Sequence, residues 1–439
     1  MNKILPLNRR QFVASMLAIS AASKTGLGFG QDIYRGPYLL RIHAAGGWDL
    51  SLYCDPKVNV SGQAAITDWS RDDDIEMAGD IPFAPVSNNA DMFSTLHQKM
   101  LVINGVDTQT NAHQTGERHT WIGSASEGRP SVTALFAAAK APQQPLSMLN
   151  YGGFSASANL VRATRVDAGN LKGVIAPRSE ISTSREEELL ERYRATGLDL
   201  ARLQVTESPW ASKRLENYRG SHLGKAGLLE LHGSIPYDLP SPEGAYKGDS
   251  NLKLEIQTSL LAFKAGVAAS AECAAGGDWD THTGGEWSQL SNITALNNGL
   301  LYLWELAESL GIANELIVLV SSDFGRTPYY NSYGGKDHWP INSYLIMAND
   351  PIWGGRVVGH TDEAQNASKI SPSTLKVSST GSIIYPKHVH HALHHYLGID
   401  DYARSVGYDF KNTELYDFFN PALTTAGPMP SPFGSSDLY

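Results

Sequence analysis

The stretch LIVLVSSDFGRT, residues 316–327, decides the predicted fold. Its first five residues are all apolar, which is typical of a strand that is covered on both faces of a sheet. An aspartate, a glycine and an arginine follow where this apolar run ends. In an open α/β sheet, ligands bind at the carboxyl ends of the strands. The stretch therefore predicts a buried strand with a polar site at its end.

Other segments repeat this order of an apolar strand followed by glycine and an acid. YLLRIHAAGGWD, residues 38–49, ends in Asp49, and GGDWDTH, residues 276–282, follows a run of small residues. Long helical patterns lie between the strands, such as residues 287–311, for which Gly311 is the expected closing residue. Strands that alternate with helices predict an α/β fold whose sheet is covered on both faces.

The N-terminal segment, residues 1–30, predicts a twin-arginine signal peptide, because Arg9 and Arg10 precede a short apolar run and small residues. An ordinary exposed helix is the alternative, and the apolar run is too short to span a bilayer well. We expect the twin-arginine export machinery as a partner, a periplasmic or secreted location, and no transmembrane segment in the mature chain. Residues 31–439 would form a single α/β domain, with an insertion or cap around residues 155–250.

The net charge of the chain narrows the classes of binding partner. The formal net charge of −10 argues against nucleic acid as a partner, because non-specific binding to nucleic acid needs a basic surface.

The sequence has two cysteines, Cys54 and Cys273, each near a glycine-rich acidic motif. In an oxidising compartment they could form a disulfide. Two buried free thiols are the alternative.

Three acids follow predicted strands: Asp49, Asp280 and Asp323. Like charges at one sheet edge repel each other, so we expect a cation or basic side chains among them. Asp280 and His282 lie two residues apart and would face the same side of an extended strand end. A carboxylate with an imidazole suits zinc, manganese or iron. The alternatives are a cap for Asp49 and an ordinary polar loop for residues 276–282.

Further candidates lie around these acids. Arg326 could bind an anionic substrate or pair with an acid. His338, next to Asp337 in GGKDHWP, could bind a metal if the glycines shape the loop, and a surface turn is the alternative. Thr115, in the segment after the second strand, is a candidate nucleophile or an ordinary cap. The histidine-rich segment 388–396 is interpreted as a solvated or partner-facing helix. His391, His394 and His395 would share one face of that helix, and adventitious binding of a metal there is the alternative.

The motifs, in their order along the chain, resemble the exported bacterial family described as domain of unknown function 1501. They are the twin-arginine leader, HAAGGWD, NAHQTGERHTWIG, GGDWDTH, SSDFGRTP, GGKDHWP, GHTDE and HHYLGID. The resemblance covers nearly the whole mature chain. That family is in turn similar to the alkaline phosphatase and sulfatase superfamily. Its fold is a mixed sheet between helices, and its members hydrolyse phosphate or sulfate esters at a two-metal site.

The resemblance implies an alkaline-phosphatase-like fold and metal-dependent hydrolysis of a phosphate or sulfate ester, carried by a small molecule or a polysaccharide. One or two divalent cations (zinc, manganese or calcium) would be bound by Asp49, Asp280, His282, Asp323 and His338. Thr115 or a metal-bound water would attack, while Arg326 and Arg118 would offset the charge of the substrate.

The chain departs from the superfamily pattern at two positions. Phe324 stands where a ligating histidine is expected, and Ala112 stands where a serine nucleophile is expected. A non-catalytic periplasmic binding or assembly protein on a degenerate hydrolase fold is therefore the alternative function.

Overall fold

The computed structural model describes residues 34–59, 64–71, 75–176, 185, 192, 225–235 and 249–420. The predicted signal peptide lies outside these residues, as does much of the predicted insertion, residues 155–250. Within the described part of the chain, no helix combines the length and the apolar character needed to cross a membrane.

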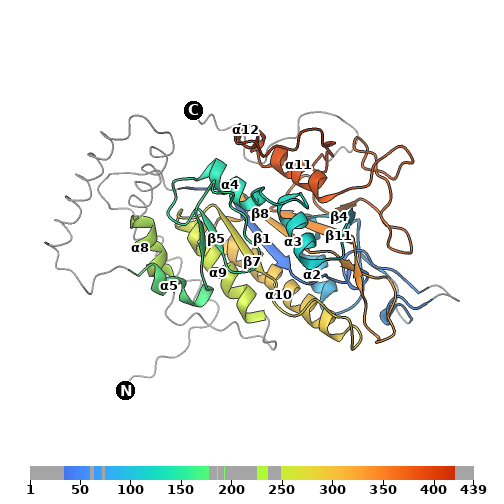
Figure 1. Ribbon diagram of the computed structural model, residues 1–439. Coiled ribbons are helices and arrows are strands. Elements are labelled where there is room, and N and C mark those ends of the chain that lie inside the picture. The colour runs from blue at the N-terminus through green and yellow to red at the C-terminus, as the bar shows by residue number, and fades with distance from the viewer. Residues whose placement is uncertain are drawn as a thin grey trace, which may run out of the picture.

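A mixed eight-stranded sheet forms the centre of the fold (Figure 1), in the order β12-β4-β11-β8-β1-β7-β5-β6. Its strands are β1 (Tyr38–Ala44), β4 (Met100–Asp107), β5 (Met148–Asn150), β6 (Ala163–Arg165), β7 (Ser270–Ala274), β8 (Leu316–Ser322), β11 (Ile341–Ala348) and β12 (Arg356–Val358). All of them run in one direction except β11, which is antiparallel to β4 and β8.

Helices cover both faces of this sheet (Figure 1). One face carries α2 (Asn89–Leu96), α9 (Asp249–Lys264) and α10 (Trp287–Leu310), and the other carries α3 (His113–Ile122), α4 (Val132–Lys140) and α11 (Pro386–Tyr396). Strand β1 shows why both faces must be covered. Leu40 and Ile42 pack into one hydrophobic cluster, and Leu39 packs into the other. The predicted α/β fold, with a mixed sheet between helices, is confirmed.

Smaller elements complete the described chain. They are β2 (Glu76–Ala78) with β3 (Ile81–Phe83), β9 (Gly325–Arg326) with β10 (His338–Trp339), α5 (Leu171–Val174), α8 (Lys225–Ser234) and α12 (Asp400–Ser405).

Short sequence signals set the helix ends. The Ser131 hydroxyl accepts a hydrogen bond from the backbone N–H of Ala134 at 3.2 Å and so caps α4. Gly311 ends α10 with a φ of 67°, a left-handed conformation that glycine adopts without steric cost. The predicted end of the helix at Gly311 is confirmed.

Strands β8, β1 and β7 are adjacent and parallel, and this arrangement creates the polar edge. Their carboxyl ends lie at one edge of the sheet. The residues that follow them in sequence, including Asp323, Asp49 and Asp280, therefore reach the same region although β1 and β8 are far apart in the chain.

Both cysteines are free and buried in the structure. Burial raises the pKa of the Cys54 thiol, and it raises that of the Cys273 thiol as well. Neither thiol readily forms the reactive thiolate as a result. Of the two interpretations of the cysteines, the structure corresponds to buried free thiols.

The prediction of a solvated or partner-facing histidine helix is wrong. His388, His390 and His394 of α11 are buried. The His388 ring accepts the backbone N–H of Tyr385 at 3.0 Å, and His390 Nε2 donates to the Thr120 carbonyl at 2.8 Å. Histidine can be buried in this way because a neutral imidazole satisfies its polar atoms with local hydrogen bonds.

These buried histidines predict a loss of stability in mild acid. Burial lowers the pKa of His388 to about 4 and that of His390 to about 3. Because an unfolded histidine titrates near pH 6.5, the unfolded chain binds more protons below that pH. The stabilising contribution is complete above about pH 6.5 and is lost as the pH falls toward the folded-state pKa values. His390→Gln should reduce this pH dependence by up to about 1.4 kcal/mol per pH unit.

The measurement is the free energy of unfolding by denaturant at a series of pH values. Each variant is compared with the parent protein, because other groups, such as buried Glu272, titrate in the same range. His360→Gln is the matched control, since His360 is exposed. Equal pH slopes for His390→Gln and the parent would contradict the prediction.

Candidate metal centre

Arg326 is the residue that joins the loops of the polar edge. Its side chain is buried, and the residue ends β9, the short strand that follows β8 in the chain. The guanidinium donates hydrogen bonds to Gly46 O, Gly47 O (2.9 Å), Trp279 O (2.8 Å), Lys336 O (3.2 Å) and Asp280 Oδ1 (2.8 Å). The loops after β1 and β7 and the segment before β10 are therefore tied to one cation. Of the two predicted roles of Arg326, the structure shows pairing with an acid.

The loops can approach so closely because glycine occupies the contact. Gly46 has a φ of 124°, and a Cβ atom there would lie 2.7 Å from the backbone nitrogen of Asp280. The glycine pair of HAAGGWD is thus needed for packing at the site.

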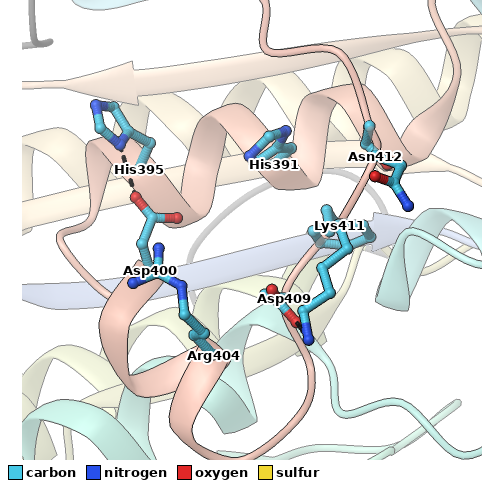
Figure 2. A pocket seen from close by; sticks show the side chains of 9 residues that line it. His391, His395, Asp400, Arg404, Asp409, Lys411 and Asn412 are labelled. Carbon is cyan, nitrogen blue, oxygen red and sulfur yellow. Dashed lines mark hydrogen bonds and ion pairs between the residues drawn. The ribbon is translucent and has the colours of Figure 1, made fainter.

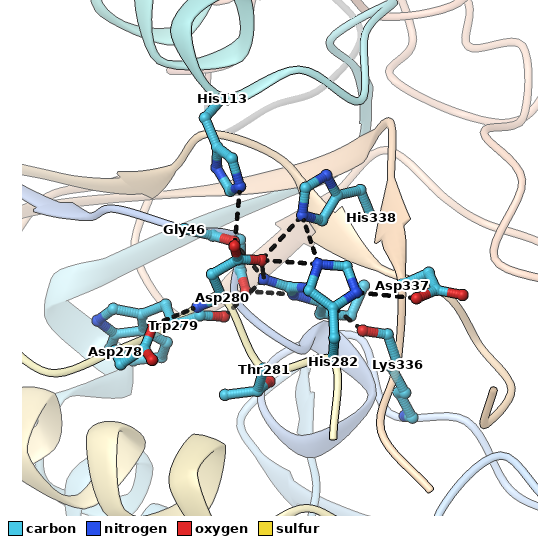
Figure 3. A network of polar contacts seen from close by, with 12 residues as sticks. Gly46, His113, Asp278, Trp279, Asp280, Thr281, His282, Lys336, Asp337 and His338 are labelled. Atoms are coloured by element: carbon cyan, nitrogen blue, oxygen red, sulfur yellow. Dashed lines mark hydrogen bonds and ion pairs between the residues drawn. The ribbon is translucent and has the colours of Figure 1, made fainter. Parts of the chain in front are cut away.

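Asp280 stands at the centre of a group of imidazoles (Figure 3). Its Oδ1 lies 2.9 Å from His282 Nε2 and 2.8 Å from His338 Nε2, and its Oδ2 lies 3.3 Å from His113 Nε2. The Nε2 atoms of His282 and His338 are 3.0 Å apart. The side chain of Asp280 is 40% exposed, so solvent and ligands can reach the group.

The other nitrogen of each ring has an acceptor. Nδ1 of His113 lies 2.9 Å from Asp323 Oδ2, Nδ1 of His282 lies 2.8 Å from Asp337 Oδ1, and Nδ1 of His338 lies 2.7 Å from the Asn111 carbonyl. Because a carbonyl or an ionised carboxylate only accepts, each Nδ1 carries a proton. In the neutral rings, the three Nε2 lone pairs then point toward the Asp280 carboxylate.

This arrangement requires positive charge. Lone pairs about 3 Å apart repel unless a proton or a metal ion lies between them. Ligands of a tetrahedral zinc ion at 2.0–2.1 Å stand about 3.3 Å apart, close to the distances found here. The ligand atoms of His113, Asp280 and His338 lie within 4.8 Å of one another, as a shared ion needs. The donor set of His113, Asp280 and His338 therefore fits a divalent cation, and His282 lies next to it, with its Nε2 3.0 Å from that of His338.

Electrostatics keep the acids ionised. Burial alone would raise the pKa of Asp280, but the hydrogen bond from Arg326 and the contact with His338 hold it well below its usual range. The pKa of Asp323 is likewise low, because hydrogen bonds from His113 and His43 outweigh its burial. The hydrogen bond to Asp323 raises the pKa of His113. The acids of the edge therefore accept hydrogen bonds in their charged form.

Asp49 lies among different partners. Its Oδ1 accepts the backbone N–H of Ser51 at 3.0 Å, and it also accepts the Ser51 hydroxyl at 2.7 Å. Its Oδ2 pairs with Lys336 Nζ at 2.7 Å. Both side chains of this ion pair are almost fully buried. Asp49 thus caps the short helical turn Leu50–Leu52, which is the alternative role that the sequence left open.

The predicted catalytic residues on α3 differ in position. Thr115 lies in the first turn of this helix, two residues after His113, and is partly exposed. Arg118 pairs with Glu127 at 2.9 Å and donates to the Ala125 carbonyl at 3.2 Å. The guanidinium of Arg118 is therefore engaged with the connection between α3 and α4.

The two departures from the superfamily pattern have structural roles. Phe324 is fully buried, and its ring packs against His113 and His338 at centroid distances of 5.0 and 4.6 Å. Ala112 is the N-cap of α3 and supplies no side-chain hydrogen bond there. The Phe324 ring thus packs against two imidazoles of the site. The N-terminus of α3, which carries His113, has no side-chain cap.

Sequence reasoning missed His113 as a candidate ligand. The sequence predicts a nucleophile in residues 111–120 and does not single out His113 within that segment. The available signal was a histidine at a helix start directly after a buried strand of the sheet, in NAHQT, residues 111–115. What the sequence did not reveal is that α3 packs over Asp323, so that the His113 ring reaches Asp280.

A second hollow lies away from this edge (Figure 2). It has a volume of about 310 Å³ and lies beside α11 and α12. Its charged groups are paired within the protein: His395 with Asp400 at 2.6 Å, Arg404 with Asp401 at 2.8 Å and Lys411 with Asp409 at 3.9 Å. These pairs make it a weaker candidate for binding a charged ligand than the edge around Asp280.

Comparison with known families bears out the predicted resemblance for the C-terminal part of the chain, and not for nearly the whole mature chain as predicted. The model of the family described as "Protein of unknown function (DUF1501)" matches residues 262–417. This span contains Asp280, His282, Asp323 and His338 but not His113. No curated protein sequence matches the chain.

Similar solved structures include several enzymes. The lipoteichoic acid synthase LtaP from Listeria monocytogenes is 8% identical, with 95% of this chain and 82% of that chain covered and a TM-score of 0.31. The alkaline phosphatase from the Antarctic bacterium TAB5 is 12% identical, with coverage of 71% and 92% and a TM-score of 0.32. The phosphonate monoester hydrolase of Agrobacterium radiobacter is 12% identical, with coverage of 82% and 74% and a TM-score of 0.31. Likeness at this level carries no function to this chain.

The contacts of Arg326 predict a large effect of a conservative change. Lysine lacks the planar fork of donors, so Arg326→Lys should leave several buried carbonyls and Asp280 without partners. We expect the free energy of unfolding to fall by about 3–5 kcal/mol, as for other broken buried pairs. Arg118→Lys makes the same chemical change in a pair with an exposed acid and should stay within about 0.5 kcal/mol. Similar losses for the two variants in denaturant unfolding would contradict this role of Arg326.

Proposed function

We propose that the protein is an exported, metal-dependent hydrolase of phosphate or sulfate esters. The observation that supports this most directly is the set of Nε2 lone pairs of His113, His282 and His338, which converge on the solvent-accessible carboxylate of Asp280. Export by the twin-arginine route rests on the sequence alone and remains part of the proposal.

The donor set favours a particular kind of ion. Imidazole and carboxylate suit zinc, and they also suit manganese. Calcium prefers ligand sets built of oxygen and fits this group less well. A divalent cation here would act as a Lewis acid toward an ester oxygen and offset the charge that develops in the transition state.

The residues of the chain would prepare the site for that ion. Asp323, Asp337 and the Asn111 carbonyl hold the three imidazoles with their Nε2 atoms facing Asp280. Arg326 holds the Asp280 carboxylate against the loop after β1. Such fixed hydrogen bonds reduce the reorganisation that binding and reaction would otherwise require.

An anionic substrate suits the start of α3. The first N–H groups of a helix point out of its N-terminus and favour negative charge. In α3 this terminus carries His113 and has no side-chain cap on Ala112. Thr115, in the first turn of the helix, remains our proposed nucleophile, with water as the other candidate.

Hydrolysis assays test this proposal. The purified protein would be stripped of metal, loaded with zinc or manganese, and given an aryl phosphate, an aryl phosphodiester and an aryl sulfate. We expect ion-dependent cleavage of at least one ester, and a fall of at least about 100-fold in Asp280→Asn and His338→Ala. His360→Ala, an exposed histidine outside the site, is the control. A metal-loaded protein that cleaves none of these esters would argue against the hydrolase.

The second candidate function is a non-catalytic binding or assembly protein. Its support is that each acid of the edge already has a basic partner in the chain. Asp49 pairs with Lys336, Asp280 with Arg326 and Asp323 with His43, at 2.7, 2.8 and 2.7 Å. These ion pairs could hold the loops of the polar edge together without any bound ion.

Thermal unfolding in the presence of zinc separates the two functions. A ligand that binds only the folded state at 100 times its Kd stabilises it by about 2.7 kcal/mol. The hydrolase predicts a rise in Tm with zinc that a chelator reverses and that Asp280→Asn removes. An unchanged Tm, together with no zinc retained after dialysis, would instead favour the binding protein.

A further inference from the structure

We propose that Asp323 is a positioning residue and not a metal ligand, and that the buried series Arg41–His43–Asp323 orients His113 in a site that binds a single ion. This inference rests on the proposed metal site, and it departs from the expectation that Asp49 and Asp323 would help to bind one or two ions.

The carboxylate of Asp323 is already surrounded by N–H donors. Its Oδ1 accepts from His43 Nε2 at 2.7 Å, and its Oδ2 accepts from the Gly46 backbone N–H at 3.0 Å and from His113 Nδ1 at 2.9 Å. The side chain is 3% exposed. A carboxylate offers about four lone-pair sites and three are filled here, so a metal could use only the remaining one. The side chain has almost no access to solvent, and a metal that displaced one of the donors would leave a buried N–H without an acceptor.

Hydrogen-bond direction fixes the state of each ring in the series. Arginine only donates, so the contact between Arg41 Nη2 and His43 Nδ1 at 3.4 Å makes Nδ1 the acceptor. In the neutral ring, the His43 proton then lies on Nε2 and faces Asp323. On the other side of Asp323, His113 donates through Nδ1, which leaves its Nε2 lone pair toward Asp280. Asp323 thus determines which nitrogen of His113 is free to bind a cation.

Arg41 makes this series costly to maintain. Its guanidinium is fully buried and stacks 3.5 Å from the Trp121 ring centroid. It donates to Ser321 Oγ at 3.2 Å, while its Nε and Nη1 have no hydrogen-bond partner. Burying a guanidinium with unsatisfied donors is unfavourable for stability. The orientation of His43, and through it of Asp323 and His113, is a role that accounts for this cost.

A second ion would lack ligands. Asp49, the other acid predicted to bind metal, is occupied by Lys336 and Ser51. Of the other predicted ligands, Asp280 and His338 can share one ion with His113, and His282 contacts both of them. Three such donors leave the fourth position of one tetrahedral zinc ion open to water or substrate.

Metal stoichiometry and affinity test the inference on the whole protein. Zinc would be measured by mass spectrometry after equilibrium dialysis, and its Kd by competition with a chromogenic chelator. We expect one zinc per chain, and Asp323→Asn should keep that stoichiometry while weakening binding by about 10–100-fold. Cobalt(II) substituted for zinc should show a changed visible absorption spectrum in this variant, because the orientation of His113 changes.

Matched variants separate positioning from general stability. Asp49→Asn alters an acid of similar burial that also pairs with a basic side chain, and it should leave the zinc Kd and the cobalt spectrum unchanged. His43→Gln keeps an N–H near the position of Nε2 and should bind zinc more tightly than His43→Leu. If Asp323→Asn does not fold, the comparison of His43→Gln with His43→Leu tests the inference in its place.

Three results would overturn the inference. They are two zinc ions per chain, the loss of a bound zinc equivalent in Asp323→Asn, and an unchanged Kd and cobalt spectrum in that variant despite lower stability. Normal zinc binding without ester hydrolysis would leave this inference intact and argue only against the proposed function. A protein that binds no zinc would overturn both.

Discussion

The guanidinium of Arg326 is the interaction on which the rest of the polar edge depends. It donates hydrogen bonds to the loop after β1, the loop after β7 and the segment leading to β10. Most of its hydrogen-bond acceptors are main-chain carbonyl oxygens. Arg326 therefore fixes the backbone path of these loops independently of the side chains of the proposed metal site. Its remaining bond, to Asp280, transmits that fixed geometry to the acid at the centre of the site.

Around this cation, donors and acceptors alternate. The Asp323 carboxylate accepts from His43 and His113, and Nε2 of His113 in turn faces Asp280. Each imidazole at the centre therefore has one nitrogen committed to the protein and one that remains available. A group of histidines arranged in this way differs from a chance surface cluster, because the second partner of each ring leaves only one tautomer favourable.

The fold was more predictable from sequence than the site. The apolar run before Asp323 predicted a buried strand, and the rule that ligands bind at the carboxyl ends of strands placed Asp323 and Asp280 at one edge. The ion-pair partner of each acid was not predictable from the sequence. Lys336 pairs with Asp49, which is hundreds of residues away in the chain, because Arg326 holds their loops together. His113 was missed for the same reason, since its role follows from the packing of α3 over β8.

The Phe324 ring has a consequence for how the site could change. It fills the space beneath His113 and His338, where an added histidine would have to stand to bring in another ligand. Replacing Phe324 with histidine would supply a new ligand, but it would also remove the apolar ring that packs against His113 and His338. Gain of a second ion would therefore demand coordinated changes in the interior. On the proposed single-ion site, side-chain packing around Phe324 would thus limit the number of ions to one.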